Sequence, residues 1–337
     1  MNVTGRHAAG LLLAAIVAAA AAACGSAGAP AVAAPPASLH TTAERAATLN
    51  WLAKTNLMWT GNDFSPLDQV TTGAARAAYL AQERATTSDP APGSRTPFQL
   101  TSLSITVPCH QGAEAVFVAY GDTDVFTLGQ SVQPVALVFQ RSGGAWKLAA
   151  VVNQPSGSGG VTWPALCLAG AGTTAPAVLP PAQYAATLSR VLDHAAAGAP
   201  QTAAATAPFA LKPFFTGPDS VTAQSATQIS QDRADGVTLA ERFSPTAVPT
   251  LALPLAGGRG YWLIGTLTQT ASYSSAAGIR TATLPDGGSL PAARPAVVHQ
   301  ATDTYITTYT ATDPLLSAGG TVELDGFFGW PLAAVAS

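Results

Sequence analysis

The feature that most constrains this fold is a change in hydrophobic period, from 3.6 residues to 2, that occurs twice along the chain. Ala47, Trp51 and Leu52 fall at helical spacing and predict a helix over 42–57, and a second helical stretch covers about 67–86. Alternating strands follow. The order then restarts with an amphipathic helix over 181–196 and a second strand series. Helices followed by an antiparallel meander predict an α+β fold in layers.

Strand and turn signals place the predicted sheets more closely. In the first half, strands are expected near 98–107, 115–120, 132–141 and 145–152, and in the second near 237–244, 248–255, 260–272, 296–312 and 320–335. A change of phase predicts a bulge near Thr101 and Ser102, and Pro134 suggests an edge strand or a bulge. A further helix over 220–234 and a long loop over 274–295 are expected.

Composition shifts divide the chain into five parts. We expect an export signal over 1–23, a disordered tether over 24–38, a first α+β domain over 39–153, a linker over 154–180 and a second α+β domain over 181–337. Each domain is predicted to have helices packed on a bent antiparallel sheet. Trp146 to Val151 and Trp330 to Val335 share a pattern at the end of each strand series, which suggests an internal duplication of two tandem domains.

The N-terminal sequence has the features of a targeting signal. Arg6 precedes an uninterrupted apolar run over 8–23, and small residues then lead into Cys24. This order is typical of an export signal, and the run is short for a membrane span. Cys24 resembles the acylated cysteine of a bacterial lipobox, although Ala21 stands where that motif usually has Leu. The sequence therefore predicts a lipoprotein on the extracytoplasmic face of the cell membrane; cleavage after Ala33 would instead give a secreted protein.

Charge and cysteine content exclude some functions. Only 10% of residues are charged and the net charge is −3, so nothing resembles the basic stripe of a nucleic-acid-binding protein. Besides Cys24, the chain has Cys109 and Cys167, and an exported protein with two such cysteines most simply pairs them. The alternative is two separate buried thiols. No Cys–His spacing resembles a zinc site.

Catalytic signals are weak. The nucleophile elbow, the phosphate-binding loop and the zinc-protease helix motif are absent from the sequence. Asp122 and Asp124 follow the strand ending near Tyr120 and could act with His110 in acid–base chemistry; the alternative is a solvated turn over 121–124. His299 and Asp303 fall four apart on a predicted strand and could form a catalytic pair, or an exposed polar pair.

Aromatic residues gather on the second strand series. Tyr305, Thr307 and Tyr309 share one strand face, with Tyr261 and Trp262 on a neighbouring strand. Rings beside hydroxyls suit a carbohydrate or peptide ligand, but such residues are also ordinary strand formers. The sequence therefore assigns no ligand-binding residues. We expect no catalytic residue, metal site or cofactor.

The predicted hairpin from Ala136 to Leu148, with its Gly143-Gly144 turn, resembles a hairpin of a known superfamily. With the helices before it, the stretch 39–153 resembles the nuclear transport factor 2-like superfamily, a cystatin-like α+β cone. The whole chain resembles uncharacterised actinobacterial lipoproteins. The resemblance implies a concave sheet face that can hold a pocket, and no particular reaction. We therefore expect a non-enzymatic binding or scaffold module with a small ligand or an envelope protein as partner; the alternative is a hydrolase or isomerase with an Asp/His pair in the cone pocket.

Overall fold

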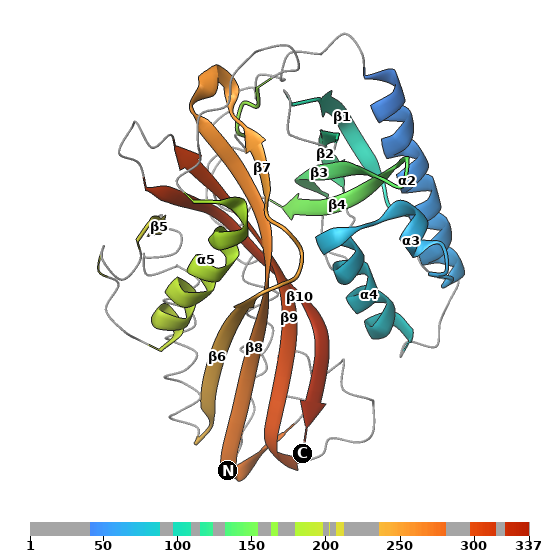
Figure 1. Ribbon diagram of the computed structural model, residues 1–337. Coiled ribbons are helices and arrows are strands. Elements are labelled where there is room, and N and C mark those ends of the chain that lie inside the picture. The colour runs from blue at the N-terminus through green and yellow to red at the C-terminus, as the bar shows by residue number, and fades with distance from the viewer. Residues whose placement is uncertain are drawn as a thin grey trace, which may run out of the picture.

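The computed structural model describes residues 41–87, 97–108, 115–123, 132–153, 163–167, 179–197, 202, 207–211, 236–280, 297–314 and 321–336. These residues form a mixed α+β fold made mostly of strands in two curled antiparallel sheets (Figure 1). The predicted α+β class is confirmed. The predicted signal, tether and helix over 220–234 lie outside the described residues.

Three helices open the described chain: α2 (Thr42–Gly61), α3 (Leu67–Val70) and α4 (Gly73–Thr87). Asn62 ends α2 in the left-handed conformation, where its N–H bonds the carbonyl of Met58. The single helix predicted over 67–86 is wrong, because α3 and α4 are separated at Thr72. The backbone N–H of Thr72 donates to the carbonyl of Leu148, 2.8 Å away on a strand, and so leaves the helical pattern.

The first sheet is a four-stranded meander in the order β1-β2-β3-β4, formed by β1 (Leu100–Thr106), β2 (Val116–Thr123), β3 (Gln133–Ser142) and β4 (Ala145–Asn153). The bulge predicted near Thr101 is confirmed by a register shift between Thr101 and Ser104. Pro134 does not mark an edge strand, because β3 is central. It is tolerated because it precedes Val135, the first residue of β3 paired with β4.

The second sheet has the order β5-β10-β9-β8-β6, with β7 also paired to β8. Its strands are β5 (Phe209–Leu211), β6 (Thr238–Pro245), β7 (Leu251–Pro254), β8 (Gly260–Arg280), β9 (Val297–Pro314) and β10 (Val322–Ala336). The long loop predicted from residue 274 begins later, because β8 continues to Arg280 beside Val297 of β9. Residues 163–167, predicted as linker, line up beside β7, where the N–H of Cys167 donates to the carbonyl of Pro254.

The elements lie in layers (Figure 1): α2 and α3 cover one face of the first sheet, the second sheet packs on its other face, and α5 (Pro181–Ala196) covers the far side of the second sheet. Helix α4 contacts both β4 and β10. Alternate residues of the first sheet face opposite cores. Phe117 and Phe139 pack against Trp51 of α2, whereas Val118 and Val138 pack toward Ile264 of the second sheet. Both faces of the first sheet are therefore buried, and each large apolar side chain there contributes about 1.5–3 kcal/mol.

The two halves share the core between the sheets, where Tyr120 meets Trp163 and Trp163 meets Trp262. They also differ in topology. The first sheet is a simple meander that packs against α2 to α4, whereas the second has a parallel β5–β10 pair and α5 on its far face. The predicted internal duplication is not confirmed by these strand orders.

Candidate functional site

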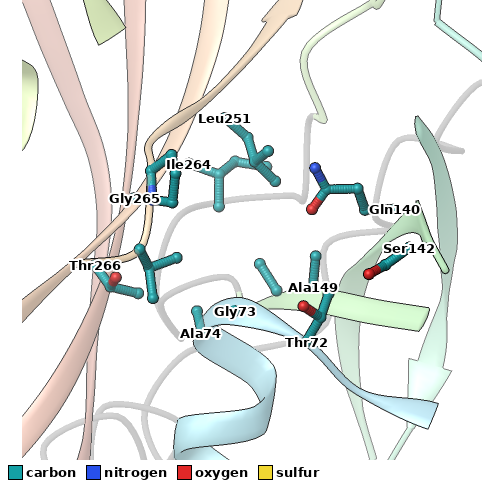
Figure 2. A pocket seen from close by; sticks show the side chains of 13 residues that line it. Thr72, Gly73, Ala74, Gln140, Ser142, Ala149, Leu251, Ile264, Gly265 and Thr266 are labelled. Atoms are coloured by element: carbon teal, nitrogen blue, oxygen red, sulfur yellow. The ribbon is translucent and has the colours of Figure 1, made fainter. Parts of the chain in front are cut away.

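A cavity of about 230 Å³ lies where the two halves meet (Figure 2). The first half contributes Thr72, the start of α4, the end of β3 and the middle of β4. The second half contributes β8 and the approach to β7. The lining residues are Thr72, Gly73, Ala74, Gln140, Ser142, Ala149, Ala150, Val248, Pro249, Leu251, Ile264, Gly265 and Thr266.

Two backbone irregularities, one in β4 and one at the start of α4, shape the part of the cavity wall that the first half of the chain supplies. Ala149 is the extra residue of a bulge in β4, because Val138 pairs with Ala150 while Phe139 pairs with Leu148. Gly73 opens α4 with a φ of +54°, a conformation that L side chains rarely adopt. A Cβ placed on Gly73 would lie 3.4 Å from the carbonyl oxygen of Ala149, an ordinary contact distance, so the positive φ rather than lack of space favours glycine here.

Hydrogen bonds of threonine hydroxyls fix the part of the cavity wall that the second half of the chain supplies. The Thr246 Oγ1 lies 2.6 Å from the Thr266 Oγ1 and also accepts the backbone N–H of Val248 at 3.2 Å. Val248 is thereby fixed next to the start of α4, where its Cγ1 faces Gly73. The segment before β7 is thus tied to β8 by side-chain bonds as well as by the strand ladder.

A second contact between side-chain hydroxyls links β9 to the segment before β7. Tyr309 of β9 lies opposite Gly265 of β8, and its hydroxyl is 2.9 Å from the Thr250 Oγ1. We call this Tyr309–Thr250 contact the strut. A Cβ on Gly265 would overlap the Tyr309 ring, so the Tyr309 side chain can cross over residue 265 only because that residue is glycine. Burial raises the pKa of Tyr309 to about 12, and the bond from Thr250 opposes part of that rise.

Both polar and apolar groups line the cavity. Figure 2 shows the amide of Gln140 and the hydroxyl of Ser142 on the side of the first sheet, facing Leu251 and Ile264. Among the lining residues that the structure describes, none carries an ionisable side chain. A liquid water takes about 30 Å³, so the space matches the volume of about seven to eight waters and suits a small molecule. It is smaller than a typical drug-binding pocket.

The predicted acid–base residues do not line this cavity. Asp122 lies within β2 and pairs with Thr101 and Pro134, so the predicted turn over 121–124 is wrong. Val116, opposite Gln140, marks the cavity end of β2, and Asp122 lies six residues further on, roughly 20 Å away along the strand. His110 and Asp124 lie outside the described residues.

His299 and Asp303 are both on β9 but do not form a catalytic pair. Residues four apart on a strand are separated by roughly 13 Å, beyond hydrogen-bond reach. The His299 Nδ1 contacts the carbonyl oxygen of Ser275 at 3.1 Å. Asp303 is buried, whereas His299 is exposed.

The predicted aromatic face is a core rather than a ligand platform. Tyr305, Thr307 and Tyr309 are all buried on the α5 side of the second sheet. Tyr309 packs in the cluster that contains Leu188 of α5. Trp262 points the opposite way, into the core between the sheets. A carbohydrate cannot stack on rings that are covered in this way.

A row of buried polar groups also lies on the α5 side of the second sheet. The Gln269 Nε2 donates to the Glu241 Oε1 at 3.0 Å, and the Thr307 Oγ1 lies 3.5 Å from the Gln269 Oε1. These bonds satisfy polar groups that would otherwise be costly to bury. No group of three or more potential metal ligands occurs within the described ranges.

Cys167 is disulfide-bonded. Its partner lies outside the described residues, as do both other cysteines, Cys24 and Cys109. The pairing of Cys109 with Cys167 therefore stays a prediction.

Sequence reasoning missed the cavity. Its lining residues come from five separate stretches of the chain and are mostly small or aliphatic. The sequence signal nearest to them is the Gly143-Gly144 turn next to Ser142.

Comparison of the chain with protein-family models, with curated proteins and with solved structures finds no match. Among the described helices, none is both long and apolar enough to cross a membrane.

Proposed function

We propose that this chain is a non-enzymatic binding module of the cell envelope that holds a small, uncharged, amphipathic molecule between its two sheets. The observation that carries this proposal is the cavity of about 230 Å³, whose described lining is free of ionisable side chains. Acid–base and nucleophilic catalysis need titratable groups held together at the reacting atoms. A lining of amide, hydroxyl and aliphatic groups is suited to binding.

The ligand class follows from the two walls. Gln140 supplies an amide that can both donate and accept, and the hydroxyls of Thr72 and Ser142 lie on the same side. Leu251 and Ile264 supply apolar surface opposite, where the Thr266 hydroxyl is already bonded to Thr246. A molecule with one hydrogen-bonding edge and one apolar face satisfies both walls. A charged ligand would lack a counter-charge among the described lining residues, and its desolvation would be costly.

The location and domain organisation belong to the same proposal. Export and acylation at Cys24 would place the cavity outside the membrane, and the sequence order at the N-terminus supports this. A cone-like first module over 39–153 is supported by the position of α2 to α4 over one face of the first sheet. An internal duplication has weaker support, namely a helix before each sheet.

A fragment screen by ligand-observed NMR tests the binding site. Ala149→Leu fills the cavity from the bulge of β4, and Ala145→Leu adds the same side chain at an exposed position of the same strand. We expect small neutral amphipathic fragments to bind the parent chain and Ala145→Leu, but not Ala149→Leu. Equal binding by all three proteins would place the ligand elsewhere and refute this site.

A further inference from the structure

Helix α2 has an unusual outward face. Seven residues fall within a sector of about 100° of its surface. Thr60 is half-buried, and the other six are exposed and form what we call the outer stripe: Thr42, Ala46, Leu49, Asn50, Ala53 and Leu57. Leu49 is 47% exposed and Leu57 71% exposed. The stripe contains no charged side chain over the length of a 20-residue helix. A helix that faces water normally carries charges on that side.

The inner face of α2 places Trp51 and Met58 in the core, but two polar residues are buried beside them. Thr48 and Thr55 are completely buried there beside Trp51, and the Thr48 hydroxyl donates to the carbonyl of Glu44 at 2.9 Å. A helix with apolar residues on both sides is expected to be covered on both sides. Within the described chain, α2 is the outermost layer (Figure 1), so the outer stripe has no cover there.

The charges around the outer stripe indicate what covers it. Arg45 borders one side of the stripe and Lys54 the other. Within the described part of the chain, both make long hydrogen bonds to neutral groups: Arg45 donates to the Leu103 carbonyl at 3.3 Å and Lys54 to the Gln69 side chain at 3.5 Å. Glu44, the one acidic residue of α2, lies on the opposite side of the helix. An apolar strip with cations along its edges and no acid is complementary to an anionic lipid surface.

The position of α2 in the chain agrees with such a surface. Cys24, the predicted lipid anchor, precedes Thr41 by 17 residues, which span at most about 60 Å even when fully extended. We propose that the outer stripe of α2 rests on the surface of an anionic bilayer, with Leu49 and Leu57 in the interface and Arg45 and Lys54 at the headgroups. This inference is separate from the cavity and its ligand.

Vesicle partitioning of the unlipidated chain tests this contact without relying on acylation. The chain from position 24 with Cys24→Ser retains every described element. It is mixed with vesicles of phosphatidylcholine, with or without phosphatidylglycerol. Leu49→Ser/Leu57→Ser removes the apolar contact, and Val132→Ser/Val297→Ser removes two valines of similar exposure elsewhere. All four positions are exposed, so urea midpoints should stay unchanged.

We expect the parent chain to bind the anionic vesicles and the leucine variant to bind about tenfold more weakly, with the valine variant within twofold of the parent. Arg45→Gln/Lys54→Gln should lower binding to anionic vesicles only. Equal binding by the leucine variant and its parent would overturn the proposal, as would no binding by the parent. A parent dimer that the leucine variant dissociates, with vesicle binding unchanged, would assign the stripe to a second copy.

Discussion

The strut between Thr250 and Tyr309 gives the sharpest stability prediction. Both residues are buried, with exposed fractions of 6% and 0%, and their hydroxyls are 2.9 Å apart. Thr250→Val removes one hydroxyl with little change in shape and leaves the Tyr309 hydroxyl without this partner. Tyr309→Phe does the converse. Each single change should lower the free energy of unfolding by about 1–3 kcal/mol, because a buried hydroxyl loses its bond.

The double variant separates the bond from the packing. When both hydroxyls are gone, no polar atom of this pair is left buried, so the loss should be smaller than the sum of the two single losses by about 1 kcal/mol. Urea unfolding of the four proteins measures this difference. Losses that add within about 0.3 kcal/mol would refute the strut as an energetic link. Gly265→Ala should disturb the same link sterically and cost about 1–3 kcal/mol.

Three further predictions concern pH and the cysteines. The pKa of Tyr309 is raised above its unfolded value by burial, so its contribution is complete below about pH 10 and is lost as the pH rises toward 12. Urea unfolding at pH 8 and pH 11 should show this loss, and equal stabilities would contradict it; burial also raises the pKa of Tyr79, Tyr120 and Tyr184. Thiol labelling of the denatured, unreduced protein should leave Cys109 and Cys167 unmodified, and labelling of both would rule out their bond. Cys24→Ala should release the protein into the medium, whereas retention in the membrane fraction would argue against acylation.

Local signals in the sequence were sufficient for individual elements. The 3.6-residue period of Tyr184, Leu188 and Leu192 predicts α5 within its observed bounds, since these residues are its buried face. The Gly143-Gly144 pair predicts the β3–β4 hairpin, because both glycines adopt positive φ. These features depend on residues close together in the chain, where periodicity and turn chemistry operate.

Features that depend on distant partners could not be predicted in this way. The break between α3 and α4 depends on a bond from Thr72 to Leu148, and the extension of β8 to Arg280 depends on its register with β9. The cavity depends on small residues such as Gly73 and Ala149, which look unremarkable in a chain rich in Ala and Gly. Their meaning comes from what lies opposite them after folding.

Native and denaturing mass spectrometry of the protein purified from its own host tests the binding proposal most directly. The parent chain and Ala145→Leu should carry a reproducible extra mass of a small neutral molecule that is lost on denaturation, and Ala149→Leu should carry none. A parent protein without extra mass, or an Ala149→Leu protein that keeps it, would contradict a ligand in the cavity between the two sheets.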